Sequence, residues 1–179
     1  MPRGHGLPHT DGQLHLFVTT PADTDTVPTP MSWSLPKKKV LVPWDFSAAS
    51  LEALEAALTL VEQAGDVTVL HAVEPSGAIA TMSEQRNRDA QDALAETLAK
   101  VRAAVNATGN EHVAVTVRFG SASDAIADYA TENNFDLIVM PSRRRKGLKR
   151  LLLGSVSEQV VRNVPVPVLL LRAANEDDE

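Results

Sequence analysis

The chain has 179 residues, of which 44% are apolar, 23 are acidic and 17 are basic. This length and apolar content are sufficient for one folded domain with its own core. The net charge of −6 repels nucleic acid and anionic membrane surfaces, so neither is expected as a partner and any anion site must be local. The absence of cysteine excludes disulfides, thiolate nucleophiles and cysteine-ligated metals. No segment has the length of a membrane span or the apolar run of a signal peptide, so the sequence predicts a cytoplasmic protein.

Residues 1–36 differ in composition from the rest of the chain. They combine prolines and polar residues with one short apolar run at 14–18. This composition buries too little apolar surface to offset the entropy cost of ordering, so we predict a disordered N-terminal arm. For His5, His9 and His15 two interpretations stay open, a metal site or solvated histidines. The second is favoured because no predicted element holds the side chains in a coordination geometry.

The folded domain is predicted over residues 37–172, followed by an acidic tail at 173–179. Apolar or β-branched segments predict strands at 40–42, 67–73, 113–117, 136–140 and 167–171. Helical spacing and capping residues predict helices from Ser47 to Gly65, at 83–107, from Ser121 or Ser123 to about 130, and at 155–163. Strands that alternate with helices imply parallel pairing through right-handed crossovers, so the sequence predicts a doubly wound α/β fold.

In such a sheet, ligands bind beyond the carboxyl ends of the strands where the winding direction reverses. The ends of the first and fourth strands are the segments 43–45, Pro-Trp-Asp, and 141–143, Pro-Ser-Arg. Asp45 is interpreted either as a ligand contact or as a helix cap, and Trp44 as a base-stacking or a packing residue. His71 lies inside the second strand with no nucleophile motif facing it, so a structural role is favoured over a general base.

Three segments resemble the universal stress protein family. These are VLVPWDFS at 40–47, the stretch 136–156 with GLKRLLLGSV at its end, and VPVPVLLL at 164–171. The resemblance covers about residues 37–172. It implies a five-stranded parallel sheet in the order 3-2-1-4-5, flanked by four helices, of the adenine nucleotide alpha hydrolase-like kind. It also implies a homodimer and, in one branch of the family, ATP or AMP held between strands one and four.

The resemblance also implies a set of nucleotide-binding residues. In the binding branch, the loop after strand four carries Gly, two residues, Gly, nine residues, and Gly followed by Ser or Thr. Glycines let the backbone approach phosphates, and amides at a helix start donate to them. Here Pro141 and Arg144 replace the first two glycines. The candidate nucleotide-binding residues are Pro43, Trp44, Asp45, Ala72, Pro141, Ser142, Arg143, Arg144, Gly154, Ser155 and Val156.

The loop after the fourth strand is strongly basic in an otherwise acidic protein. Residues 143–150 contain Arg143, Arg144, Arg145, Lys146, Lys149 and Arg150. One interpretation is that arginine side chains replace the lost amide contacts, because a guanidinium binds phosphate in a bidentate manner. The favoured interpretation is a solvated loop. Ser155 is expected to cap the helix that it begins.

The last strand is apolar and lies at an edge of the predicted sheet. An exposed edge of this kind invites pairing with another chain. We therefore predict a homodimer through Val166, Val168, Leu169 and Leu170.

Taken together, the sequence predicts a non-enzymatic, dimeric regulatory or binding module of the stress response, with weak, altered or absent adenine nucleotide binding. ATP or AMP is the candidate ligand, and no metal is expected without nucleotide. The alternative is a genuine ATP or AMP binder that uses arginine side chains in place of the missing glycines.

Overall fold

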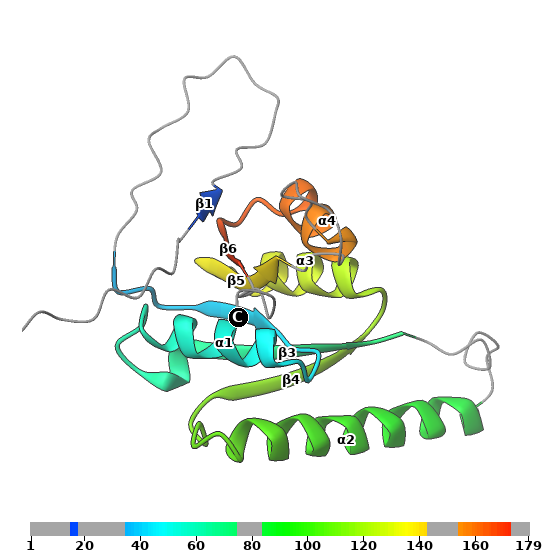
Figure 1. Cartoon of the computed structure of the whole chain (residues 1–179). Helices are drawn as coiled ribbons and strands as arrows, with labels where there is room; N and C mark the ends of the chain where they lie inside the picture. Colours follow the sequence, from blue (N-terminus) through cyan, green and yellow to red (C-terminus); the bar gives the residue numbers. More distant parts are fainter. Residues whose placement is uncertain (1–14, 18–34, 75–83, 143–153, 173–179) are drawn as a thin grey trace, which may run out of the picture.

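The structure, a computed structural model, describes residues 15–17, 35–74, 84–142 and 154–172 (Figure 1). The strands are β1 (His15–Phe17), β2 (Val40–Pro43), β3 (Val67–Val73), β4 (Ala114–Phe119), β5 (Leu137–Ser142) and β6 (Val168–Arg172). The α-helices are α1 (Ala48–Leu58), α2 (Glu84–Asn106), α3 (Ala122–Glu132) and α4 (Ser155–Asn163), and one 3₁₀ turn spans Ala64–Asp66.

All the described strands belong to one sheet, in the order β1-β6-β5-β2-β3-β4. Strands β2 to β6 pair in parallel, and β1 pairs with β6 in the antiparallel direction. Without β1, the order of the parallel strands is the predicted 3-2-1-4-5. The doubly wound α/β fold with four α-helices in the described chain is therefore confirmed.

Two apolar clusters fill the two faces of the sheet. Val40 and Val42 pack into the first cluster, whereas Leu41 packs into the second, as the alternation of a strand requires. Helices α1 and α2 cover the first cluster, and α3 and α4 cover the second (Figure 1). Each strand of the sheet centre is thus buried on both sides, which explains its nearly continuous apolar sequence.

The capping predictions for the first and third helices hold. Ser47 is the N-cap of α1 and accepts a hydrogen bond from the Ser50 amide, and Ser121 is the N-cap of α3. The end of α1 is different, because the helix stops at Leu58 rather than continuing to Gly65. Beyond it, the Lys37 amide donates to the Leu60 carbonyl over 2.8 Å, so the chain here leaves the helix to pair with the segment before β2.

Strand β5 is longer than the sequence predicted. Pro141 and Ser142 were expected to open the loop, but they continue β5 and pair with Leu171 and Arg172 of β6. A proline lacks an amide hydrogen and is tolerated where a strand has a neighbour on one side only. That condition holds here because β2 pairs with β5 only as far as Ile138.

The structure also differs from the predicted disordered arm at three residues. His15–Phe17 form β1, which adds a strand to the outer edge of β6. An edge strand carries a row of unpaired amide and carbonyl groups, and an added strand satisfies them. The other residues of the arm, except Leu35 and Pro36, lie outside the described ranges, as does the acidic tail 173–179.

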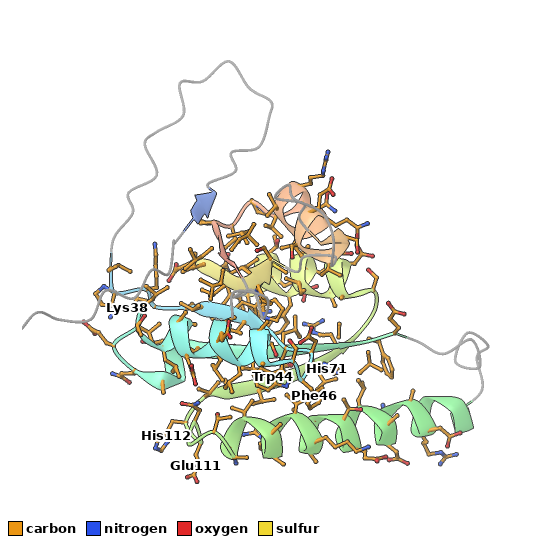
Figure 2. The ribbon with its side chains drawn as sticks, viewed as in Figure 1. Lys38, Trp44, Phe46, His71, Glu111 and His112 are labelled. Carbon is orange, nitrogen blue, oxygen red and sulfur yellow. The ribbon has the colours of Figure 1, made fainter. Side chains whose placement is uncertain are left out.

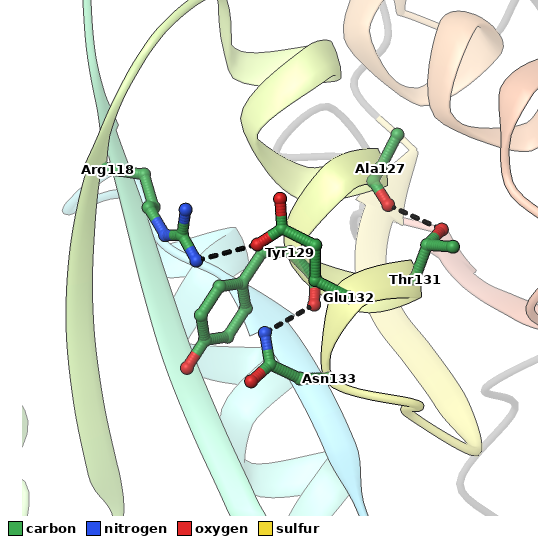
Figure 3. A network of polar contacts seen from close by, with 6 residues as sticks. All are labelled: Arg118, Ala127, Tyr129, Thr131, Glu132 and Asn133. Atoms are coloured by element: carbon green, nitrogen blue, oxygen red, sulfur yellow. Dashed lines mark hydrogen bonds and ion pairs between the residues drawn. The ribbon is translucent and has the colours of Figure 1, made fainter.

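At the opposite edge of the sheet, β4 is tied to α3 by one arginine (Figure 3). Arg118 donates to the Glu132 carboxylate over 2.9 Å, and its guanidinium lies 4.9 Å from the centre of the Tyr129 ring. The end of α3 is closed by the Asn133 side chain, which donates to the Tyr129 carbonyl over 2.9 Å. The side chains of Arg118 and Glu132 are partly exposed, and their contacts indicate a structural role for Arg118.

Candidate functional site

Strands β2 and β5 stop pairing before either of them ends. Their register covers only Val40 with Leu137 and Leu41 with Ile138. Beyond that point β2 stays with β3, because the Trp44 amide donates to the Leu70 carbonyl over 2.8 Å, and β5 stays with β6. The winding direction reverses between these two strands. The structure therefore places the ends of β2 and β5 at the topological switch point where doubly wound sheets bind ligands.

Three aromatic side chains gather at the carboxyl ends of β2 and β3 (Figure 2). The Phe46 ring lies 5.1 Å from the His71 ring and 6.3 Å from the Trp44 ring, both in edge-to-face geometry. His71 Nδ1 donates to the Trp44 carbonyl over 2.7 Å. A carbonyl can only accept, so in the neutral ring Nδ1 carries the hydrogen and Nε2 is the acceptor. The structural interpretation of His71 is supported by this bond.

The members of this aromatic cluster differ in exposure. Trp44 is 6% exposed, whereas Phe46 is 49% exposed. Among the described side chains, Trp44 Nε1 is the buried polar atom that has no hydrogen-bond partner. Phe46 also has a φ of 63°, a left-handed conformation that is rare for a bulky residue and that concentrates at functional sites. Trp44 is thus the buried member of the cluster, and Phe46 is its solvent-facing member.

Asp45 takes part in the cap of α1. Its Oδ1 accepts hydrogen bonds from the Ser47 amide, at 3.0 Å, and from the Ser47 hydroxyl. The same hydroxyl accepts from the Ser50 amide, so Asp45 orients the N-cap residue. The side chain is exposed. The capping role left open by the sequence is therefore present, and the role of Asp45 toward a ligand stays a prediction.

The β5 side of the site is joined to α4. The buried Ser157 hydroxyl donates to the Pro141 carbonyl over 3.1 Å, and the Ser142 hydroxyl donates to the Leu171 carbonyl over 3.0 Å. The expectation that Ser155 caps α4 is wrong, because Gly154 is the N-cap and Ser155 is the exposed first residue of the helix. Glycine has no side chain, so the N-cap residue itself accepts no side-chain hydrogen bond from the first-turn amides.

The remaining candidates are placed as follows. Pro43 is half-buried at the end of β2, and Ala72 is half-buried in β3, two residues beyond Leu70. Val156 packs against the second apolar cluster. Arg143 and Arg144, like the rest of the basic loop, lie outside the described residues.

A metal site finds no support in the described part of the chain. It contains no group of three or more His, Cys, Asp or Glu side chains placed to hold an ion. His5 and His9 lie outside that part, and His15 contributes its backbone to β1. None of the described helices is long and apolar enough to cross a membrane.

The predicted interface residues are all buried within the chain. Val166 precedes β6, and Val168, Leu169 and Leu170 lie in it. The backbone edge of these last three residues is paired with β1.

Sequence reasoning did not identify Phe46 as a site residue, nor the bond that joins His71 to the end of β2. No periodic pattern marks Phe46, because it lies in the turn between β2 and α1. The signal is its conformation, which only the backbone shows.

Comparison with known proteins adds an independent observation. A model of the universal stress protein family matches residues 37–172. Universal stress protein MJ0531 of Methanocaldococcus jannaschii is 30% identical over 149 residues, which are 78% of this chain and 85% of that protein. Universal stress protein YxiE of Bacillus subtilis is 33% identical, over 75% of this chain and 98% of its own length.

Solved structures agree on the fold. The structure of the hypothetical protein MJ0577 is similar with a TM-score of 0.60 and 27% identity, over 79% of this chain and 100% of that one. A universal stress protein in complex with cAMP is similar with a TM-score of 0.53 and 21% identity, over 78% of this chain and 99% of that one. The family match over residues 37–172, together with the observed strand order and the relatives in two organisms, shows that this chain belongs to the universal stress protein family.

Proposed function

We propose that this protein is a non-enzymatic regulatory module of the cytoplasmic stress response that binds adenine nucleotides weakly, mainly through the base. The observation that carries the proposal is the parting of β2 and β5 next to the aromatic cluster of Trp44, Phe46 and His71. The carboxyl ends of β2 and β5 are the place where this fold binds ligands, and the cluster adds a partly exposed aromatic surface there.

The base half of the site has the chemistry that a purine needs. A half-exposed Phe46 ring offers a stacking face, and base–aromatic stacking contributes about 1–3 kcal/mol per base. The exposed Asp45 carboxylate follows Trp44 directly and is suited to accept from an exocyclic amino group. In a neutral ring His71 Nε2 adds a second acceptor in the same cluster.

The phosphate half is weaker. Pro141 lies within β5 and has no amide hydrogen to offer, and the Ser142 hydroxyl already donates to the Leu171 carbonyl. What supports some phosphate binding is the start of α4, where the N-cap residue Gly154 has no side chain to cap the first amides. We therefore expect the phosphates to add little to the affinity for the nucleotide that the base provides.

The absence of catalysis is also part of the proposal. The hydroxyls of Ser142 and Ser157 donate to backbone carbonyls, and His71 Nδ1 does the same. A nucleophile and its base need a hydrogen bond to each other, and these three side chains direct theirs to the backbone instead.

The test is a titration with adenosine, AMP and ATP with magnesium. The chain has two tryptophans, so Trp33→Phe leaves Trp44 as the single fluorophore at the site. We expect saturable quenching by all three ligands with dissociation constants within about tenfold of one another, that is within about 1.4 kcal/mol. Guanosine is the base control. Absence of saturable binding by every adenine compound would overturn the proposal.

A variant pair tests the stacking surface. Phe46→Ala is expected to weaken adenosine binding by about tenfold, because it removes the stacking face. Leu35→Ala is the matched control, since Leu35 is the other large apolar residue exposed in the described chain, at 56%. Equal affinity of the two variants would show that Phe46 does not contact the base.

The second candidate function is a genuine ATP binder. It is favoured by one observation, the six basic residues within positions 143–150. In that case ATP binds at least about 100-fold more tightly than adenosine, because arginines hold the phosphates. Arg144→Gln then lowers the affinity for ATP but not that for adenosine, which calorimetry distinguishes from the first proposal.

We also propose that two copies associate through the edge of β6. The support is an apolar edge strand, and twofold symmetry would pair the two copies of β6 in the antiparallel direction. In the structure β1 occupies this edge, so association requires β1 to leave it. Sedimentation from about 1 to about 500 μM tests the proposal, since a dimer forms with rising concentration and a monomer throughout would overturn it.

A further inference from the structure

Strand β1 stands apart from the rest of the sheet in two ways. It lies outside residues 37–172, which the family model matches, whereas every other described strand lies inside them. It is also the antiparallel strand of a sheet whose other described pairs are parallel. β1 is therefore an addition to the family domain, placed on the outer edge of its last strand.

The direction of this pairing carries the inference. A second copy related by a twofold axis would bring its own β6 to the same edge, and the two strands would run antiparallel. β1 runs antiparallel to β6, with His15 opposite Leu170, Leu16 opposite Leu169 and Phe17 opposite Val168. It thus satisfies the same backbone groups, in the same direction, that a partner strand would satisfy.

The chain is long enough for β1 to reach the edge of its own domain. Strands β1 and β2 are separated by β6 and β5, which places them about 14 Å apart at the usual strand spacing. Positions 18–39 provide 22 residues between them, which extend to at most about 80 Å. A tethered strand competes at an effective concentration on the order of millimolar, above that of a free second copy.

Strand β1 is also short enough to be displaced from the edge of β6. β1 pairs over three residues, whereas β6 has five, Val168–Arg172. A partner strand that pairs along more of β6 makes more backbone hydrogen bonds than β1 does. The edge of β6 can therefore be occupied by β1, which pairs weakly but is tethered nearby. It can also be occupied by a second copy, which pairs more strongly but depends on the protein concentration.

We infer that β1 is a built-in competitor of self-association, which occupies in its own chain the β6 edge through which two copies pair. The inference rests on the proposed homodimer. Both chains must release β1 before they pair, so if each edge is closed about nine-tenths of the time, the apparent dissociation constant of the dimer rises about 100-fold.

A disulfide trap tests where β1 lies. The chain has no cysteine, so the pair Phe17→Cys and Val168→Cys in the full chain introduces two thiols and no others. These residues are directly opposite each other, and such Cα atoms are about 4.5–5.5 Å apart, within the range of a disulfide. Phe17→Cys with Thr116→Cys, on the opposite edge strand β4, is the matched control.

After mild oxidation at about 1 μM, we expect an intrachain disulfide in the first pair and none in the control, read by non-reducing gels and peptide mass mapping. The oxidised protein should stay monomeric at concentrations at which the reduced protein associates. A disulfide between chains would overturn the inference, because β1 would then be exchanged between copies. Failure to form any disulfide would overturn it as well.

A proline variant tests the competition. Leu16→Pro removes a backbone donor and restricts the strand at the centre of β1, so it should lower the dissociation constant of the dimer by about 100-fold in sedimentation. Thr10→Pro, in the arm but outside β1, should leave it unchanged. If Leu16→Pro forms a dimer but associates no more tightly than the unaltered chain, the competition is overturned and the homodimer stands. If Leu16→Pro remains monomeric throughout, the homodimer falls and the competition with it.

Discussion

At the scale of single residues, the end of β2 is fixed by hydrogen bonds from side chains to the backbone. His71 reaches across from β3 to the Trp44 carbonyl, and Asp45 holds Ser47 in its capping position. Phe46, which lies between Asp45 and Ser47 in the sequence, is half-exposed and has a φ of 63°. The local backbone therefore determines which aromatic ring is exposed to solvent and which ring is packed.

His71→Leu is expected to lower the free energy of unfolding by about 1–2 kcal/mol. Leucine keeps most of the side-chain volume but removes the donor, so the Trp44 carbonyl loses its side-chain partner. Chemical denaturation followed by tryptophan fluorescence gives the value.

The matched control is His112→Leu. His112 is exposed near the end of α2 (Figure 2), and its replacement should change stability by less than about 0.5 kcal/mol. Equal effects of the two substitutions would contradict the importance of the bond to Trp44.

At the scale of secondary structure elements, α4 is attached to the end of β5 by one buried hydrogen bond. Ser157 is 3% exposed and donates to the carbonyl of Pro141. This bond fixes the start of α4 next to the strand end at which the phosphate half of the proposed site lies. The position of α4 thus depends on a serine that follows the N-cap by three residues.

Ser157→Ala should lower stability by about 1–2 kcal/mol, because a buried acceptor loses its partner. Ser155→Ala, on the same helix, is the control and should cost less than about 0.5 kcal/mol, since Ser155 is exposed and is not the cap. The two midpoints of urea unfolding measure the difference. A larger cost for Ser155→Ala would restore the predicted capping role of that serine.

At the scale of the whole molecule, the two apolar clusters share the strands between them. Val40 and Leu41 are neighbours in β2 but pack on opposite faces, and Leu137 and Ile138 in β5 do the same. Loss of packing on one face therefore disturbs strands on which the other face depends. We expect the domain to unfold as a single cooperative unit.

Leu54→Ala should lower the free energy of unfolding by about 2–5 kcal/mol, because Leu54 is fully buried in the first cluster and its truncation leaves a cavity. Glu55→Ala, exposed on the same helix, should have an effect below about 0.5 kcal/mol. Circular dichroism and tryptophan fluorescence should give the same midpoint for Leu54→Ala. Separate midpoints would contradict a single unit.

The sequence was most informative where a residue's role depends on its immediate neighbours. Ser47 and Ser121 were identified as candidate caps because capping is a contact over three residues. Ser155 was misassigned for the same reason, since a serine at the start of a helical pattern is indistinguishable from a cap when the preceding glycine takes that position. Arg144, the second position of the glycine comparison, lies outside the described residues.

By itself, the sequence determined the parallel sheet of five strands, because apolar strands that alternate with helices pair in parallel through right-handed crossovers. The strand order was implied by the resemblance of the sequence to the universal stress protein family. Only the tertiary structure decided that β2 and β5 part after Ile138, that His71 bonds to Trp44, and that β1 covers the edge of β6. These contacts join residues that are between 27 and 155 positions apart in the chain, as His71 with Trp44 and His15 with Leu170 show. The pattern of a local segment carries no information about such a distant partner, so the edge predicted to bind a second chain was found paired with the protein's own arm.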